Sequence, residues 1–233
     1  MERLDKIIAS QGKYSRKDVK KLVQQKRISI DGKIVSNSDI KIDSDKSIIK
    51  IDDKEINIKK NLYLILNKPK GYISATEDKK VQTVLDLVPK DLFRDDLFPA
   101  GRLDKDTTGL MIITNDGILA HNILSPKKHI QKIYEVTLDI PPTDEMVRIF
   151  ADGIILNDGK CKPGEMTITG EYTAIVKITE GRYHQIKRMF GCCKAKVLEL
   201  KRLGMRNLLL PKDLKEGECR ELTESELLLL QEK

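Results

Sequence analysis

The segment AGRLDKDTTGLMIITNDG, residues 100–117, gathers several charged side chains just before an apolar run. A Pro-Ala-Gly turn precedes it, and residues 110–114 predict a strand that follows. Asp104 therefore lies in a loop at the start of a strand, where a rigid scaffold can hold a functional side chain in the open. An ionised aspartate there can act as a nucleophile or accept a proton. The alternative is a surface loop in which Asp104 and Asp106 form Asx turns.

A carboxylate that is buried under a ligand needs a neighbouring cation, because burial alone raises its pKa and neutralises it. The segment EGRYHQIKRMF supplies candidates. Its spacing predicts a helix that starts near His184 and carries His184, Lys187 and Arg188 on one face, with its positive dipole end at that start. On spacing alone, Lys187 reads as a surface lysine and Ile186 as a core residue.

The elements around these segments mix strands and helices without regular alternation. A buried strand over 63–66 stops at Lys68-Pro69, since proline cannot donate to a sheet, and the chain must turn at Gly71. Further strands are predicted at 110–114, 133–138, 173–179 and 196–200, and helices at 81–88, 118–124, 143–151, 184–192 and 224–230. Thr223 and Glu226 have the spacing of a capping box. We expect an α+β fold with a mixed, largely antiparallel sheet.

Positive charge is concentrated at the N-terminus. The net charge is +7, and residues 1–33 hold ten Lys and Arg against four Asp and Glu. Such a concentration is typical of a surface that binds a polyanion, because neutralised phosphates release their counterions. A solvated, lysine-rich helix face is the alternative on composition alone.

The same N-terminal segment predicts a small helix-helix-hairpin unit. One helix carries Leu4, Ile7 and Ile8, and Ser15 can cap a second. A strand pair then turns at Asp31-Gly32. The outward face of the second helix is basic and consists of Arg16, Lys17, Lys20 and Lys21. Short Ile-containing alternations over 37–60 predict edge strands and a linker, so we expect domains at 1–60 and 61–233.

Composition excludes several classes of protein. No apolar stretch is long enough for a transmembrane helix, and MERLDKIIAS is not a signal peptide, so we expect a cytoplasmic protein without a membrane partner. The four cysteines form no CxxC pair and the three histidines are far apart, so we expect no metal site and no disulfide framework.

Two resemblances extend this interpretation. RLDKIIASQGKYSRKDVKKLVQQKRISIDGKIV resembles the S4-type (alpha-L) RNA-binding domain, which implies structured RNA as the partner; a protein-binding module of the same shape is the alternative. GRLDKDTTGL resembles the pseudouridine synthase signature GRLDxxTxGL, and KPKG, KKHIQKIYEV and EGRYHQIKRMF resemble further motifs of that superfamily in the same order. Together the segments look most like the RsuA-type ribosomal subfamily, within its 16S rRNA group. Where its members commonly have small residues and a glycine, this chain has GCCKAK, so the resemblance implies that Lys194 or Ala195 makes a turn there.

The resemblance implies roles for individual residues. Asp104 is the catalytic carboxylate, Lys187 its ion-pair partner, and Tyr134 the residue that stacks on the uracil. Ile186 packs near the base, and Arg102 fills the gap that the flipped nucleotide leaves. His184 either contacts RNA or is structural, and Arg188 is a further residue expected to bind RNA. Lys105 and Asp106 have no role.

The implied function is isomerisation of one ribosomal RNA uridine to pseudouridine, at the single 16S site of this group (the uridine-516 class). We expect a monomer that needs no cofactor or metal and acts on ribosomal RNA or a small-subunit assembly intermediate. The alternatives are a 23S rRNA uridine and a non-catalytic RNA-binding assembly factor. Hydrolysis of the glycosidic bond would require a second catalytic carboxylate, and the sequence identifies none.

Overall fold

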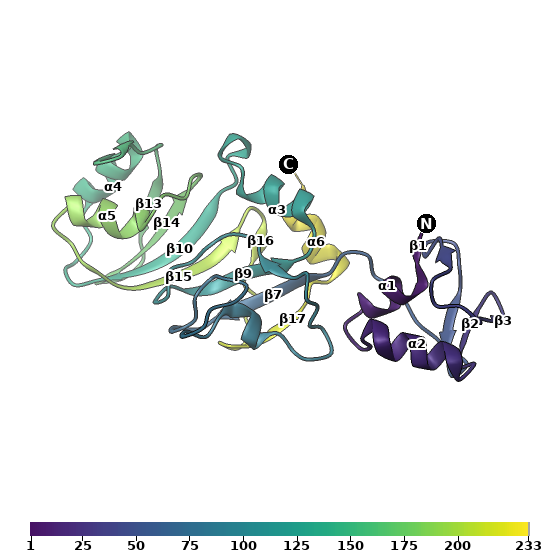
Figure 1. Cartoon of the computed structure of the whole chain (residues 1–233). Coiled ribbons are helices and arrows are strands. Elements are labelled where there is room, and N and C mark those ends of the chain that lie inside the picture. The colour runs from purple at the N-terminus through teal and green to yellow at the C-terminus, as the bar shows by residue number, and fades with distance from the viewer. Residues whose placement is uncertain (233) are drawn as a thin grey trace. The chain divides into compact units, whose positions relative to one another are not determined.

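The computed structural model describes residues 1–232, and the chain divides into two compact units (Figure 1). Unit 1 comprises Met1–Leu62 together with Val88–Leu97, and unit 2 comprises Tyr63–Leu87 and the chain from Phe98 onward. Each unit has a hydrophobic core of its own.

Unit 1 consists of two short helices and small antiparallel sheets. The helices are α1 (Leu4–Ala9) and α2 (Arg16–Gln24); the strands are β1 (Glu2–Arg3), β2 (Ile28–Ile30), β3 (Lys33–Ile34), β4 (Lys41–Ile42), β5 (Ile49–Ile51) and β6 (Lys54–Glu55). One sheet has the order β3-β2-β5-β6 and the other pairs β1 with β4. The predicted hairpin at Asp31-Gly32 is confirmed, since β2 and β3 pair across it.

Local sequence explains why α2 begins at Arg16. The Ser15 side chain accepts a hydrogen bond from the Asp18 N–H, and the Asp18 carboxylate accepts one from the Ser15 N–H, which together form a capping box. The apolar stripe of α2 is buried in the core of unit 1, and the basic residues Arg16, Lys17, Lys20 and Lys21 are exposed as predicted.

A buried carboxylate joins the two helices of unit 1. The Asp5 side chain is fully buried and lies 2.9 Å from Arg3 Nη2 and 3.0 Å from Arg16 Nη2. Hydrogen bonds from Arg3 and then from Arg16 lower the pKa of Asp5 to about 2, although burial opposes this. Arg16 therefore has a structural contact in addition to its position on the basic face.

Unit 2 contains one large sheet with helices packed against it. Its helices are α3 (Gly117–Leu124), α4 (Asp144–Asp152), α5 (Gln185–Cys192) and α6 (Glu224–Gln231), with single 3₁₀ turns η1 (Val84–Leu87) and η2 (Pro126–Lys128). Its strands are β7 (Tyr63–Lys68), β8 (Phe98–Pro99), β9 (Thr108–Thr114), β10 (Lys132–Leu138), β11 (Ile155–Leu156), β12 (Gly159–Lys160), β13 (Glu165–Ile168), β14 (Thr173–Ile178), β15 (Val197–Met205), β16 (Leu208–Leu209) and β17 (Cys219–Glu221).

The sheet has the order β13-β14-β10-β15-β9-β7-β17, with β16 on β15 and β8 on β9. Only the pairing of β9 with β15 is parallel among its described strand pairs, so the predicted mixed, largely antiparallel sheet is confirmed. Gly109 makes this parallel pairing possible. It has φ +98°, and a Cβ there would lie 2.2 Å from the Arg202 carbonyl oxygen.

One part of the core of unit 2 lies between the sheet and the helices α3 and α6. Leu110 and Ile112 of β9 pack there with Leu119 and Ile123 of α3 and with Leu230 of α6. Every residue of β9 is buried, so the strand that follows the Asp104 loop is anchored on both faces.

One expectation about local structure needs correction. The predicted helix over 81–88 is only the turn Val84–Leu87, because Gln82 and Val84 use their backbone groups to pair with Ile73. The sequence also does not predict the short strands β8, β11, β12, β13, β16 and β17. The turn at Lys194 is confirmed by its φ of +60°.

Candidate active site

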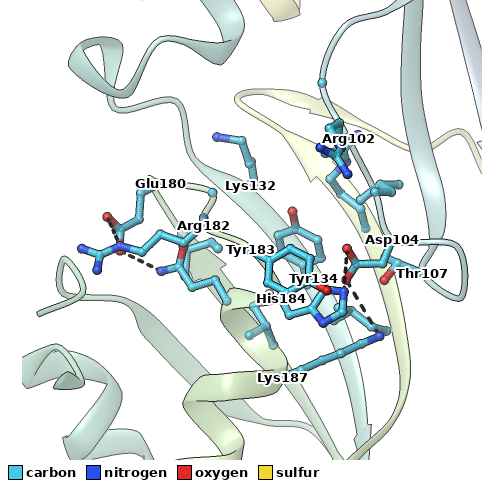
Figure 2. A pocket seen from close by; sticks show the side chains of 18 of the residues that line it. Arg102, Asp104, Thr107, Lys132, Tyr134, Glu180, Arg182, Tyr183, His184 and Lys187 are labelled. Atoms are coloured by element: carbon cyan, nitrogen blue, oxygen red, sulfur yellow. Dashed lines mark hydrogen bonds and ion pairs between the residues drawn. The ribbon is translucent and has the colours of Figure 1, made fainter. Parts of the chain in front are cut away.

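A cavity of about 460 Å³ opens on unit 2 between the sheet, the Asp104 loop and the start of α5 (Figure 2). Its volume lies in the range of small-ligand sites. The residues that line it come from segments far apart in the sequence: 101–107, 132–134, 178–187 and 200–202. The sheet supplies the floor, and the two loops supply the rim.

Strand register places the floor residues on one face of the sheet. Tyr134 of β10 lies opposite Arg202 of β15, and Lys132 lies opposite Ile178 of β14. Directly opposed residues in antiparallel strands share a face, and residues two apart on one strand do so as well. Tyr134 is 8% exposed, so its ring forms a buried aromatic surface at the base of the cavity.

The Asp104 carboxylate lies at the rim and faces two cationic or ionisable groups from the α5 segment. Its Oδ1 is 3.4 Å from His184 Nε2, and its Oδ2 is 3.8 Å from Lys187 Nζ. Figure 2 shows these three side chains pointing toward one another. The structure thus brings together the carboxylate and the lysine for which the family resemblance implies an ion pair.

Lys187 also contacts a second carboxylate, which the sequence interpretation left without a role. Its Nζ donates to Asp106 Oδ1 at 2.8 Å and to Asp106 Oδ2 at 2.7 Å. These hydrogen bonds lower the pKa of Asp106. The ammonium therefore lies between two carboxylates and is closer to Asp106 than to Asp104.

The backbone of the Asp104 loop is held from below by Lys68, the last residue of β7. Lys68 is fully buried, and its Nζ lies 2.8–3.3 Å from the carbonyl oxygens of Pro69, Asp104, Lys105 and Thr107. Burial lowers the pKa of Lys68 to about 8, while the nearby Asp106 and Asp104 act in the opposite direction. An ammonium that binds several carbonyls fixes the path of the loop without any of the loop's own side chains.

Two more buried cations lie at the floor of the cavity. Arg202 is 2% exposed and donates from Nε to the Leu110 carbonyl at 2.7 Å, while its Nη2 makes no hydrogen bond to any residue that the structure describes. Lys132 donates to the Ile130 carbonyl at 3.1 Å, and burial and the neighbouring Arg202 lower its pKa to about 8. These charges give the floor a positive potential that suits an anionic ligand.

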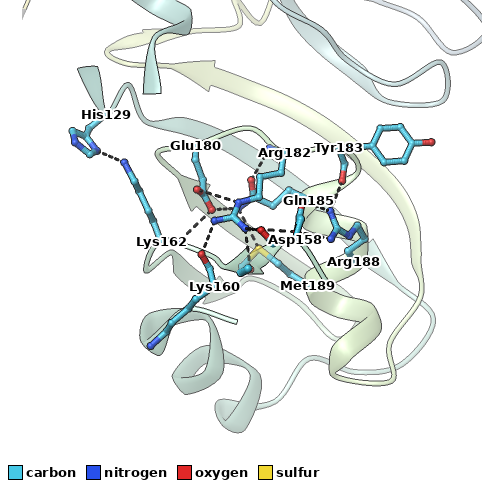
Figure 3. A network of polar contacts seen from close by, with 11 residues as sticks. His129, Asp158, Lys160, Lys162, Glu180, Arg182, Tyr183, Gln185, Arg188 and Met189 are labelled. Carbon is cyan, nitrogen blue, oxygen red and sulfur yellow. Dashed lines mark hydrogen bonds and ion pairs between the residues drawn. The ribbon is translucent and has the colours of Figure 1, made fainter. Parts of the chain in front are cut away.

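The segment that carries His184 is fixed by a polar network (Figure 3). Arg182 donates to the carbonyls of Gly159 at 2.9 Å and Lys160 at 2.5 Å in the β11–β12 hairpin. The Arg182 N–H donates to Gln185 Oε1 at 2.9 Å. These contacts stabilise the left-handed conformation of His184, whose φ is +46°, just before α5 begins.

The remaining predicted residues fall in different places. Arg102 is exposed and Ile186 is buried, and both line the cavity. Arg188 does not line it: its guanidinium binds Asp158 at 2.6 and 3.1 Å. The expectation that Arg188 shares a face with His184 and Lys187 is therefore wrong, because His184 precedes the helix and Arg188 turns toward the β11–β12 hairpin. Arg16, Lys17, Lys20 and Lys21 belong to unit 1.

Sequence reasoning missed several residues that shape the site. Lys132 could have been found, because it precedes Tyr134 by two in a strand and so shares its face. Lys68 at the end of an apolar strand also gave a signal, since a lysine in a buried run needs partners. Arg202 gave none, because the sequence does not reveal which strand lies beside β9.

Within residues 1–232 no group of His, Cys, Asp or Glu side chains is arranged to hold a metal ion. None of the helices described is long and apolar enough to cross a membrane. The chemistry that the site supports directly is that of one carboxylate beside a lysine and a histidine, above an aromatic floor with buried positive charge.

Comparisons with known proteins agree with this geometry. Residues 62–191 match the family model described as RNA pseudouridylate synthase, and residues 2–46 match the S4 domain. The chain is 43% identical over 235 residues to the Bacillus subtilis protein named "uncharacterized RNA pseudouridine synthase YtzG", which covers 99% of this chain and 98% of that protein. It is 38% identical to ribosomal small subunit pseudouridine synthase A of Escherichia coli, covering 97% and 98%.

A solved structure extends the likeness to three dimensions. A crystal structure of a pseudouridylate synthase superimposes with a TM-score of 0.69 at 36% identity, covering 99% of this chain and 100% of that one. The matched segments include the Asp104 loop, the Tyr134 strand and most of α5. The chain therefore belongs to the RNA pseudouridylate synthase family, as an isomerase with an N-terminal S4 domain.

Proposed function

We propose that this chain isomerises one uridine of small-subunit ribosomal RNA to pseudouridine, and that the uridine is position 516 of 16S rRNA. The observation that carries the activity is the Asp104 carboxylate at the rim of a cavity with an aromatic floor, beside Lys187 and His184. The specificity draws support from relatives named ribosomal small subunit pseudouridine synthase A, which match the chain over nearly its whole length. Such an enzyme acts in the cytoplasm, where ribosomes are assembled.

The reaction needs no net oxidation or reduction. The bond from uracil N1 to ribose C1′ breaks, the uracil turns within the cavity, and C5 bonds to C1′ while the C5 proton is lost and N1 gains one. Asp104 promotes the first step either by attack on the sugar or base or by removing the C2′ proton. Each route requires the ionised carboxylate, and Lys187 Nζ places a positive charge 3.8 Å from Asp104 Oδ2.

The cavity residues bind and orient the base. The Tyr134 ring offers a stacking surface, and stacking of a base on an aromatic side chain contributes about 1–3 kcal/mol. This offsets part of the cost of flipping a uridine out of folded RNA, which is a few kcal/mol. Ile186 supplies an apolar wall. Arg102 at the exposed rim occupies the space that the flipped nucleotide leaves, where its guanidinium can stack and also bind a phosphate.

In this proposal, unit 1 docks on the RNA. The exposed lysines of α2, Lys17, Lys20 and Lys21, form a basic face next to Arg16. Such a face binds phosphates and releases counterions, so it adds affinity without reading the sequence. The target uridine is then selected by the surroundings of the cavity.

A modification map tests the proposal. Wild type and Asp104→Asn are incubated with unmodified 16S rRNA, 23S rRNA and partly assembled small subunits, and pseudouridines are located by carbodiimide-blocked primer extension. We expect a new stop at uridine 516 of 16S rRNA with wild type only. Asp106→Asn is the matched control, because it removes the neighbouring carboxylate from the same loop.

The outcomes separate the parts of the proposal. If wild type gives no stop on any RNA, the enzymatic function is refuted and the alternative is an RNA-binding assembly factor. If a stop appears only in 23S rRNA, the small-subunit specificity is refuted. If wild type and Asp104→Asn give equal stops, Asp104 has no role in the mechanism.

A further inference from the structure

A second cavity adjoins the first at the Asp104 loop. It has a volume of about 510 Å³ and is lined by Ile73, Ser74, Ala75 and Lys105 together with residues that also line the first cavity. The shared residues are Arg102, Leu103, Asp104, Tyr183 and His184. The two cavities therefore meet at the Asp104 carboxylate, and a chain molecule with one residue in the first can place its neighbour in the second.

One wall of the second cavity presents an aromatic ring to solvent. Tyr183 is 71% exposed, and its ring stacks on the imidazole of His184 with centroids 3.9 Å apart and planes 16° from parallel. The imidazole covers one face of the ring and leaves the residue largely open. The chain at this point is fixed by the Arg182 contacts to the β11–β12 hairpin, so the ring is held before any ligand arrives.

Two cations also line the second cavity. The side chains of Arg102 and Lys105 are exposed and make no hydrogen bond or ion pair with other residues in the described part of the chain. Ser74 lines the same cavity, and its Oγ donates to the Leu103 carbonyl at 2.8 Å and accepts from the Leu103 N–H at 2.9 Å. That hydroxyl is already engaged in fixing the loop, so the flat ring and the free cations remain for binding.

We propose that this second cavity is a subsite for the nucleotide next to the target uridine, with its base stacked on Tyr183 and its phosphate bound by Arg102 and Lys105. The inference rests on the proposed function, because it requires RNA whose uridine occupies the first cavity. An aromatic ring beside unpaired cations is the combination that binds single-stranded nucleotides. Stacking accepts every base but favours a large one, so the subsite contributes to the choice of sequence context.

The experiment removes either partner of the predicted stack. The RNA that wild type modifies in the mapping experiment is prepared intact, or with an abasic ribose directly 5′ or directly 3′ of the uridine. kcat/KM is measured for wild type, Tyr183→Ala and Tyr183→Phe. Tyr172→Ala is the matched control, since Tyr172 is also an exposed tyrosine of unit 2 but lines neither cavity.

On intact RNA we expect Tyr183→Ala to lower kcat/KM by about fivefold to a hundredfold, and Tyr183→Phe and Tyr172→Ala to retain it. One of the two abasic RNAs should lower wild-type kcat/KM by a similar factor, and Tyr183→Ala should lower it no further on that RNA. The substitution and the missing base would then remove the same contact, so their effects on kcat/KM would not add.

Several results would overturn the subsite while leaving the proposed function in place. Suppose that wild type turns over both abasic RNAs and that Tyr183→Ala lowers kcat/KM on each of them as much as on intact RNA. The Tyr183 ring would then act through His184 and not by stacking on a neighbouring base. An unchanged kcat/KM for Tyr183→Ala on intact RNA, or a Phe variant as impaired as Ala, would exclude stacking. If wild type turned over none of these RNAs, the proposed function would be refuted, and the subsite with it.

Discussion

Lys187 Nζ lies 2.7 Å from Asp106 Oδ2 but 3.8 Å from Asp104 Oδ2. The cation that faces the Asp104 carboxylate is thus also bound by a second carboxylate two positions along the same loop. Asp106 is 68% exposed, whereas Asp104 is 29% exposed, so water screens the shorter contact more than the longer one. We therefore expect the longer contact, to Asp104, to matter more for the proposed activity.

Lys187→Met and Asp106→Asn should differ widely in activity. Lys187→Met removes a charge beside the partly buried Asp104, and we expect kcat to fall by about a hundredfold or more. Asp106→Asn removes an exposed carboxylate and leaves Lys187 facing Asp104, so we expect kcat within about threefold of wild type. Single-turnover rates on the modified RNA measure both. A larger loss for Asp106→Asn than for Lys187→Met would reverse the assignment.

Lys68→Met should weaken both stability and activity. The variant leaves several carbonyls of the Asp104 loop without their buried donor, at a cost of about 2–4 kcal/mol in the free energy of unfolding. We also expect kcat to fall by about tenfold or more as Asp104 loses its position. Urea denaturation and single-turnover kinetics measure the two effects. Lys70→Met is the control, because Lys70 is exposed and pairs with the exposed Glu199 at 3.0 Å. Equal effects of the two variants would contradict the argument.

Gly109→Ala should prevent the close approach of β9 and β15. A Cβ would lie 2.2 Å from Arg202 O and 2.8 Å from Arg202 N, and φ is +98°. We expect a loss of about 3 kcal/mol or more, which lowers Tm by about 6–12 °C in a chain of this size. Differential scanning fluorimetry compares it with Gly117→Ala, where φ is ordinary and the space is open. A Tm equal to that of the control would show that the strands can move apart freely.

Asp5 should make the stability of unit 1 depend on pH. Its folded pKa of about 2 lies below the ordinary 3.8, so the stabilisation is present above about pH 3.8 and is lost as the pH falls toward 2. Asp5→Asn should lower the free energy of unfolding of unit 1 by about 1–2 kcal/mol at pH 7, since its arginine partners are partly exposed. Thermal unfolding from pH 6 to pH 3 should show the difference from wild type narrowing below pH 4. Asp53→Asn, an exposed site, is the control, and a difference that stays constant with pH would exclude the effect.

The lysines of α2 should set the salt dependence of RNA binding. Replacing Lys17, Lys20 and Lys21 by glutamine should weaken binding and reduce the slope of log K against log salt by about 2. Fluorescence anisotropy at several KCl concentrations measures this. The control replaces Lys196, Lys212 and Lys215, which are exposed lysines of unit 2, and should leave the slope nearer to that of wild type. The same slope in both triple variants would mean that α2 does not bind phosphate.

Elements encoded by local interactions could be predicted from the sequence. The caps at Ser15 and Thr223 are both present, because each capping box involves only residues three apart. The failed helix over 81–88 shows the limit: a tertiary pairing with Ile73 took the backbone groups that a helix would have used.

The sequence predicts which residues line the site better than it predicts the contacts between them. Asp104, Tyr134 and Lys187 were found from motifs, and the structure brings all three to one cavity. The contact of Lys187 with Asp106 joins residues 81 positions apart, and Arg202 is buried beside β9 through a parallel pairing. Such contacts depend on how strands are ordered in the sheet, which no local pattern encodes.

The anchoring of the Asp104 loop by Lys68 has a consequence for protein engineering. Because Lys68 binds main-chain oxygens of the loop, this anchoring of Asp104 does not depend on which side chains occupy positions 105 and 106. We expect that a library that varies those two exposed positions alters the surface offered to RNA while the main chain that carries Asp104 keeps its path. In the proposed enzyme, a main chain of fixed path and a variable recognition surface would then lie within a few residues of each other.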